Sequence, residues 1–273
     1  MKLYAVSTAL LEACSLEQAV AAVAATGFKH IELGGDAISE WIADPARVRR
    51  VVEAAGLAIS SLHSPETGWD NGNADPTARA ASLQAAADSL SCAAEMGCRV
   101  VIIHPNKPPT EDQAPFTAET FADYWARSRE SLAYLAEQSR IAGVRIAVEN
   151  MPARGLPRPG ATMGQIIELI HDLGEHVGIC LDAGHSNTNG ISAAREATEA
   201  GEHLFAVHIQ DNDGAGDDQH IMPGLGTTDW PALLAALDNM NYAGPRTFEV
   251  LHGDAPEALL RAMDELRLRW TNE

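Results

Sequence analysis

Short β-like runs alternate with Ala-rich amphipathic stretches along the whole chain, and this alternation limits the fold more than any other feature of the sequence. Strands that are separated by helices of this length form parallel sheets. Eight such units fit a closed (β/α)8 barrel of about 250 residues better than the alternative, an open doubly wound sheet. We therefore predict an α/β protein in which residues 1–273 form one TIM barrel domain.

The predicted elements follow one another in strict order. Strands are expected at 3–7, 30–33, 58–63, 99–104, 145–149, 177–182, 204–209 and 246–251. Helices are expected at 16–25, 45–55, 76–96, 117–142, 163–173, 192–200, 230–240 and 256–269. The longest irregular stretches are 64–74, 105–115, 151–161 and 210–229, and each of them follows a strand. Because the loops after strands form the catalytic face of a barrel, we expect the functional site there.

Seven predicted strands carry an ionisable residue at their carboxyl ends. A buried ionisable side chain is costly unless it is paired or coordinated to a metal. At any single position, a salt bridge that caps a strand explains such a residue equally well, but the recurrence predicts a shared site. The seven residues are Glu32, His63, His104, Glu149, Asp182, His208 and Glu249.

The last four of these residues suit a divalent metal ion. Three carboxylates and one imidazole offer hard oxygen donors and one nitrogen donor. We expect Mn²⁺, with Co²⁺, Mg²⁺ or Zn²⁺ as alternatives. A structural zinc site built from thiolates is not indicated, because no set of cysteines has ligand spacing. The predicted metal ligands are Glu149, Asp182, His208 and Glu249.

The loops after the strands add further candidates. In L-D-A-G-H, Gly184 is expected to allow a sharp turn that points His185 back into the site. Asp218 and His220, in the loop after the seventh strand, form a D-x-H pair that suits a second metal or the substrate. Some loop residues suit a sugar ring or an anionic group, although shielding or solvation explains them as well. These are Trp69, Phe116, Lys107, Arg154 and Arg158.

Composition excludes several classes of function. The formal net charge is −19, which disfavours the displacement of counterions from a DNA backbone, so we expect no nucleic acid partner. No apolar stretch is long enough for a membrane span, and a signal peptide is not indicated. The four cysteines form no C-x-x-C pair, which is typical of reduced thiols and predicts a cytoplasmic protein.

Eight short motifs together resemble the xylose isomerase-like TIM-barrel superfamily, in its sugar phosphate isomerase and epimerase branch, which is related to endonuclease IV. The resemblance covers essentially the whole chain, and it is strong for the superfamily but does not distinguish one activity within it. The motifs are H-S-P (63–65), V-I-I-H-P (101–105), V-E-N (148–150), L-D-A-G-H (181–185), H-I-Q-D (208–211), D-Q-H (218–220), P-G-L-G (223–226) and F-E-V (248–250).

The resemblance implies an isomerase or epimerase that acts on a ketose or keto-polyol. Glu149 and Glu249 would then be the catalytic acid and base, and the metal would stabilise the enediolate that forms when a proton beside the carbonyl is removed. We expect the substrate to be a sugar or polyol, and the resemblance implies a homodimer or homotetramer. The expected substrate contacts are His185, His63, His104, Glu32 and Trp69.

Three alternatives remain open. A keto-polyol dehydratase or lyase of the inosose dehydratase type begins with the same proton abstraction, and no residue here separates it from an isomerase. An endonuclease IV-like phosphodiesterase would use three metals, because His63, His104 and Glu149 can be assigned to one site and His185, Asp218 and His220 to another. The acidic charge and the first strand, which lacks the expected glycine-histidine pair, oppose it. A non-catalytic binding barrel would not require these ligands.

Overall fold

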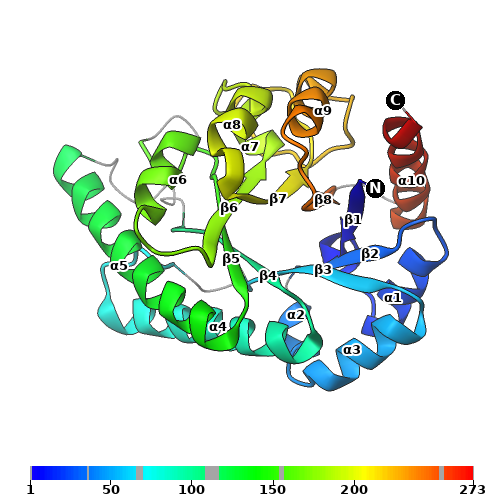
Figure 1. Ribbon diagram of the computed structural model, residues 1–273, viewed down its shortest axis with the longest axis horizontal. Coiled ribbons are helices and arrows are strands. Elements are labelled where there is room, and N and C mark those ends of the chain that lie inside the picture. Colours follow the sequence, from blue (N-terminus) through cyan, green and yellow to red (C-terminus); the bar gives the residue numbers. More distant parts are fainter. Residues whose placement is uncertain are drawn as a thin grey trace.

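The computed structural model describes residues 2–35, 37–65, 70–107, 117–153, 157–251 and 255–272. Eight parallel strands close into a barrel in which each strand pairs with its sequence neighbours and β8 pairs with β1. The helices lie around the outside of the barrel (Figure 1), so the predicted α/β TIM barrel is confirmed. The strands are β1 (Leu3–Ser7), β2 (His30–Leu33), β3 (Ala58–His63), β4 (Val100–Ile103), β5 (Arg145–Glu149), β6 (Val177–Asp182), β7 (Leu204–Ile209) and β8 (Pro245–Phe248).

Every predicted helix is present, and two short helices, α2 and α7, were not predicted. Asp and Ser or Thr side chains cap most of them, as at Asp75, whose carboxylate accepts from the first backbone N–H groups of α4. The helices are α1 (Leu16–Ala24), α2 (Ile38–Trp41), α3 (Pro45–Ala54), α4 (Pro76–Met96), α5 (Ala118–Ala142), α6 (Met163–Ile170), α7 (Ala183–Thr188), α8 (Ala193–Ala200), α9 (Trp230–Asn239) and α10 (Pro256–Asn272).

Two strands end earlier than predicted. β4 ends at Ile103 and β8 ends at Phe248, so His104 and Glu249 lie just beyond them, at the rim of the barrel. The backbone N–H of Glu249 still donates to the carbonyl of Ile209, at 3.0 Å. Both residues therefore stay at the carboxyl ends of the strands, where the site was expected, although they belong to the loops.

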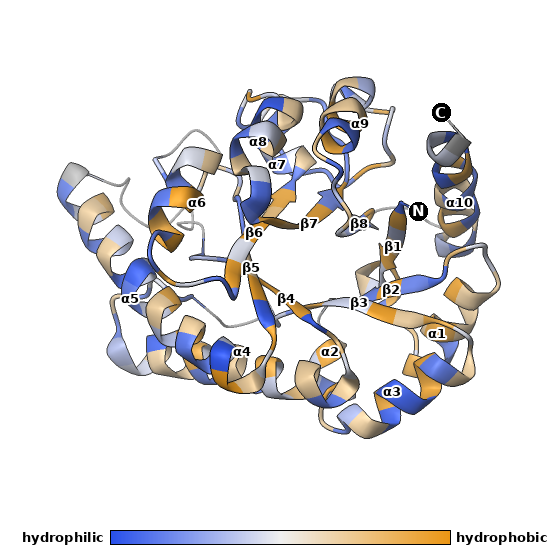
Figure 2. Ribbon diagram, viewed as in Figure 1, coloured by the Kyte–Doolittle hydropathy of each residue, from blue (hydrophilic) through white to orange (hydrophobic). Residues whose placement is uncertain are grey.

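The two sides of the strands face different surroundings. Outward-facing side chains pack against the helices in one large apolar core, and Figure 2 shows apolar residues along the strands and hydrophilic ones on the outer surfaces of the helices. The interior of the barrel holds a second, smaller apolar cluster, on which the ionisable side chains at the carboxyl ends rest. Its residues are Val100, Ile102, Ala147, Cys180 and Ala206.

A register shift between β6 and β7 decides which side chains face the site. Ile179 pairs with Leu204, but Cys180 pairs with Ala206, so β7 contains one additional residue, Phe205. Because neighbouring residues of a strand point to opposite faces, this bulge sets the facing of every later residue. The shift places His208 directly beside Asp182.

The role that the sequence suggests for Gly184 is wrong. Gly184 lies inside the short helix α7, which Asp182 caps by accepting from the N–H of His185 at 2.6 Å, and the backbone at Gly184 has no positive φ. The glycine is needed for close packing, because a Cβ there would lie 2.1 Å from the side chain of Gln210. Helix α7 can therefore approach β7 closely.

Replacement of Gly184 by alanine is expected to destabilise the protein by about 1–3 kcal/mol, because the buried Gln210 has to move. Gly164→Ala is the matched control: Gly164 also lies in a helix, but its nearest neighbour is the exposed Glu199 side chain at 3.2 Å. The control should be neutral or slightly stabilising. Urea unfolding measures both, and equal stabilities of the two variants would contradict this account.

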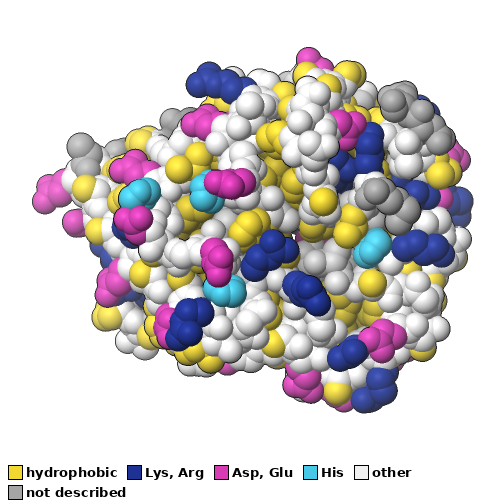
Figure 3. All heavy atoms as spheres, viewed as in Figure 1, with side chains coloured by type: hydrophobic (Ala, Val, Ile, Leu, Met, Phe, Trp, Pro, Cys, Tyr) yellow, Lys and Arg dark blue, Asp and Glu magenta, His cyan; other side chains and the backbone are white. Residues whose placement is uncertain are grey.

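No helix among the described residues is long and apolar enough to cross a membrane. On the face that Figure 3 shows, Lys and Arg side chains are interspersed with acidic and apolar ones and form no continuous basic surface. This face therefore lacks the feature by which a protein usually binds a nucleic acid backbone.

Candidate metal centre

The carboxyl ends of β5 to β8 bring the four predicted metal ligands together. Glu149, Asp182, His208 and Glu249 are buried, and each offers a ligand atom that lies within 4.8 Å of the others. Nδ1 of His208 is central: it lies 3.1 Å from Oε2 of Glu249, 3.4 Å from Oε1 of Glu149 and 3.9 Å from Oδ2 of Asp182. Because every second side chain of a strand points into the barrel, residues at the same height on neighbouring strands bring these ligand atoms together.

The atoms at this position fit a divalent cation. Asp182 Oδ2 and His208 Nδ1 are buried and have no hydrogen-bond partner among the described residues. A buried polar atom without a partner costs free energy, and such atoms in a native fold require an explanation. One cation among three carboxylates and an imidazole satisfies them together, and this donor set suits a hard or borderline ion.

Electrostatics at the site reflect the pairing of carboxylates with imidazoles. Burial raises the pKa of Glu149, but the nearby His208 and His104 hold it well below its ordinary value. Burial also raises the pKa of Glu249, and His208 lowers it to about 2. Burial raises the pKa of Asp182 to about 7; His185 opposes this rise, and the neighbouring carboxylates of Glu149 and Glu249 add to it. Without a metal, protonated imidazoles therefore balance the ionised glutamates.

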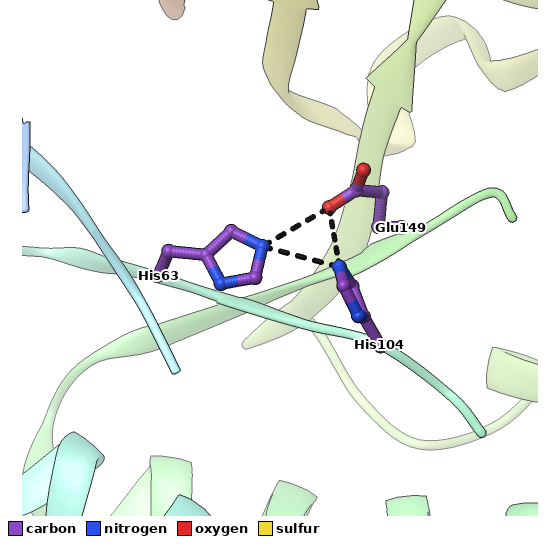
Figure 4. Close-up of side chains that lie close together, drawn as sticks. All are labelled: His63, His104 and Glu149. Atoms are coloured by element: carbon purple, nitrogen blue, oxygen red, sulfur yellow. Dashed lines mark hydrogen bonds and ion pairs between the residues drawn. The ribbon is translucent and has the colours of Figure 1, made fainter. Parts of the chain in front are cut away.

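His63 and His104 both point toward one oxygen of Glu149, as Figure 4 shows. Their Nε2 atoms are 3.1 Å apart, and they lie 3.5 Å and 3.3 Å from Oε2 of Glu149. These three side chains form a second group that could hold a metal ion. The two oxygens of Glu149 thus face different groups, since Oε1 faces His208 and Oε2 faces the histidine pair.

A third group lies on α7 and on the loop after β7. His185 Nε2 is 3.0 Å and His220 Nε2 is 3.2 Å from Oδ2 of Asp218, and these residues also have metal-ligand spacing. Burial raises the pKa of Asp218, but the two histidines hold it far below its usual range. Burial lowers the pKa of His220, whereas Asp218 raises it to about 9. His185 does point into the site, as the sequence predicts.

Two polar residues that received no role from the sequence hold Asp182 in place. The side chain of Asn150 accepts from the backbone N–H of Asp182 at 2.7 Å and donates to its carbonyl at 3.1 Å. The backbone carbonyl of Asn150 lies 2.8 Å from Nδ1 of His185. Gln210 donates to the carboxylates of Asp182 and Asp218, at 3.1 Å and 2.9 Å. The sequence could have indicated Asn150 and Gln210 only through their positions, because Asn150 follows Glu149 in V-E-N and Gln210 lies close to His208 in H-I-Q-D.

Asp211 organises the loop after β7 and does not face the metal centre. Its carboxylate accepts from the backbone N–H groups of Gly224, Gly226 and Thr228, at 2.8 to 3.2 Å, and from Nε1 of Trp230 at 2.9 Å. Burial raises its pKa, but these donors hold the pKa below the ordinary value. The P-G-L-G segment is therefore tied to the end of β7, which is not the structure of a freely solvated loop.

Several predicted contacts have a different environment in the structure. Glu32 is completely buried and contacts Ser61 and His208, which does not fit the predicted contact with substrate. Arg158, a candidate for an anionic group, is also buried, and its guanidinium donates to the side chain and backbone of Asn106, so it is not the solvated loop cation of the alternative reading. Lys107 remains exposed. The predicted positions Trp69, Phe116 and Arg154 lie outside the described residues.

Comparison with models of protein families identifies the family of this barrel. A family model described as xylose isomerase-like TIM barrel matches residues 20–269. The chain belongs to this family. The resemblance drawn from the motifs is thus confirmed, and the matched range includes all four predicted metal ligands.

Similar sequences include an uncharacterized protein and a sugar isomerase. An uncharacterized protein of Methanocaldococcus jannaschii is 27% identical over 192 residues, which are 69% of this chain and 63% of that protein. Xylose isomerase of Thermus thermophilus is 26% identical over 220 residues, which are 74% of this chain and 55% of the isomerase. The chain thus spans less than two thirds of the length of either relative.

Solved structures share the whole fold. A D-tagatose 3-epimerase-like protein superimposes with a TM-score of 0.82 and 22% sequence identity, over 100% of this chain and 98% of that chain. Other structures with this fold are sugar 3-epimerases. At this level of identity the likeness establishes the barrel, and the chemistry has to be argued from the site.

Metal affinity is expected to increase as pH rises. Burial lowers the pKa of His208, but the surrounding acidic groups raise it well above its ordinary value, so the ring has to lose a proton before it can bind a metal. Asp182, with a pKa of about 7, must also be deprotonated, which weakens binding further as pH falls below that value. Titration calorimetry with Mn²⁺ in buffers of different ionisation enthalpy measures both effects. Affinity that is independent of pH, with no proton release, would contradict this assignment.

Proposed function

We propose that the protein is a divalent-metal-dependent isomerase or epimerase of a ketose or keto-polyol. The observation that carries this proposal is the arrangement of Glu149 and Glu249, two buried carboxylates at the carboxyl ends of β5 and β8 that both face Nδ1 of His208. A substrate carbon beside this position would have a carboxylate available on each side. The family and the sugar 3-epimerases that share the fold support the substrate class.

The two glutamates would carry the proton. Each has a pKa below its ordinary value, so each is ionised at neutral pH and can act as a base toward the carbon beside a carbonyl. The bound metal would stabilise the negative charge that develops on the substrate oxygens. If the same carboxylate returned the proton to the neighbouring carbon, the sugar would be isomerised. If the other carboxylate first took a proton from water and delivered it to the opposite face of the carbon that was deprotonated, the sugar would be epimerised at that carbon.

His185 would orient a substrate oxygen at this site. Its Nδ1 lies 2.8 Å from the carbonyl of Asn150, and its Nε2 lies 3.0 Å from Asp218, so the ring is held at both nitrogens. Because both nitrogens are engaged in the structure, a substrate oxygen would have to replace Asp218 at Nε2, while the contact with Asn150 keeps the ring in place. We further propose Mn²⁺ as the metal, a cytoplasmic location and a homodimer or homotetramer.

The proposal is tested by following solvent deuterium into a ketose beside its carbonyl by NMR, in the presence of Mn²⁺. Glu149→Gln and Glu249→Gln should each lower the exchange rate by about 10²–10⁴-fold, because each removes a base. Asp217→Asn is the control: this exposed aspartate lies on the loop after β7 beside Asp218, and its loss should leave the rate unchanged. Absence of exchange with any ketose or keto-polyol in the unchanged enzyme would refute the proposal.

A dehydratase would pass the same exchange test and then expel a hydroxyl group. The appearance of an absorbing enone product separates it from an isomerase. If the enone forms while the recovered ketose shows no isomer, the reaction is a dehydration.

A second candidate is a phosphodiesterase, which the three neighbouring ligand groups favour. Hydrolases of phosphate esters use ions about 3.5–4 Å apart to stabilise the attacking and leaving oxygens. Metal analysis decides between the candidates: three zinc ions per chain with cleavage of an abasic duplex would favour the hydrolase, whereas one ion per chain with deuterium exchange would favour the isomerase.

A further inference from the structure

Glu32 is a buried carboxylate that contacts the metal centre from behind. Its Oε2 lies 3.3 Å from Nε2 of His208, the ring nitrogen that faces away from the other three ligands. Glu32 is on β2 and His208 is on β7, and these strands are not neighbours in the barrel. The contact therefore crosses the interior of the barrel and joins residues that are 176 positions apart in the sequence.

Carboxylates lie beside both ring nitrogens of His208, at Nε2 from Glu32 and at Nδ1 from Glu149 and Glu249. A neutral imidazole carries one N–H and one lone pair. When a cation is bound among the carboxylates at Nδ1, the lone pair is needed there, and Glu32 is the acceptor that keeps the proton on Nε2. With the proton on Nε2 directed at Glu32, the lone pair of Nδ1 is directed at Glu149 and Glu249. We propose that Glu32 is a positioning residue that sets the tautomer and ring plane of His208 for metal binding. This role rests on the metal centre proposed above.

Ser61 holds Glu32 in the required position. Its hydroxyl donates to Oε2 of Glu32 at 2.6 Å, and both residues are completely buried. The contact depends on a register shift, because Ile31 pairs with Ile59 whereas Glu32 pairs with Ser61. In an unshifted register Glu32 would lie opposite Ser60, whose hydroxyl donates to the carbonyl of Ile31. The bulge thus serves this contact, as bulges beside functional sites often do.

The contacts of Glu32 favour a positioning role over a contact with substrate. Its Oε2 is engaged by Ser61 and by Nε2 of His208, the ring nitrogen that faces away from the other predicted ligands. A buried carboxylate is costly and is kept only where it is paired. Carboxylates that accept from the second nitrogen of a metal-bound histidine orient the ring and increase its basicity, and loss of such a partner typically weakens metal binding by about 10–100-fold.

The first test measures Mn²⁺ affinity by calorimetry in the absence of substrate. Glu32→Gln should bind Mn²⁺ about 10–100-fold more weakly than the wild type, and Ser61→Ala should shift the affinity in the same direction by less. Thr247→Val is the matched control, because Thr247 is buried and pairs with His208 in the register, while its hydroxyl has no hydrogen-bond partner among the residues that the structure describes. Its Mn²⁺ affinity should equal that of the wild type.

A second readout does not depend on affinity. In the Mg²⁺-loaded, ¹⁵N-labelled wild type, we expect a slowly exchanging ring proton on Nε2 of His208. In Glu32→Gln this resonance should move upfield or be lost to exchange, because the amide is a weaker acceptor. A ring proton on Nδ1 in the wild type would overturn the proposal.

The remaining outcomes are equally decisive. Unchanged Mn²⁺ affinity in folded Glu32→Gln, with an increased KM for the sugar at saturating Mn²⁺, would overturn the positioning role and indicate a substrate contact. If Glu32→Gln does not fold, unchanged affinity in Ser61→Ala overturns the role. Failure of the wild type to bind any divalent metal would overturn the metal centre together with this role, whereas metal binding without sugar chemistry would affect only the proposed function.

Discussion

The pairing of carboxylates with imidazoles inside the barrel is the interaction on which the rest of the structure depends. Glu149 and Glu249 are buried beside His208, and Asp218 lies between His185 and His220. Any of these charges alone would be too costly to bury. Protonated imidazoles compensate them in the absence of a metal, and a divalent ion can replace those protons. The fold can therefore tolerate its site in either state, because charge balance is kept in both.

Most of the site could be predicted from the sequence because it follows from the geometry of strands. A mostly apolar run that ends in a carboxylate or imidazole has its last side chain at the rim of a barrel, and parallel strands bring such rims together. This argument found Glu149, Asp182 and His208 without knowledge of any contact. The helices could also be located from the sequence, because the residues that cap their ends are local signals.

The parts that the sequence did not reveal depend on contacts without a local signal. Asn150 acts through hydrogen bonds to the backbone of Asp182, 32 residues away, and no pattern of neighbours indicates such a bond. Glu32 was expected to touch substrate because it ends a strand like the other candidates, but a register shift and the ring of His208 determine its environment. Gly184 was misread for a similar reason, since its neighbour Gln210 comes from another strand.

The register shift between β6 and β7 couples one irregularity in the sheet to the chemistry at the mouth of the barrel. If Ile179 and Leu204 kept their pairing and the ladder then ran without the shift, Phe205 would lie opposite Cys180 and Val207 opposite Asp182. The imidazole of His208 would then turn toward the helices. Deletion of Phe205 would instead leave Ala206 opposite Cys180 and His208 opposite Asp182. The pairing of β7, and not its length, therefore separates a barrel with an ion-binding mouth from one with a plain apolar wall, although both contain the same ligands.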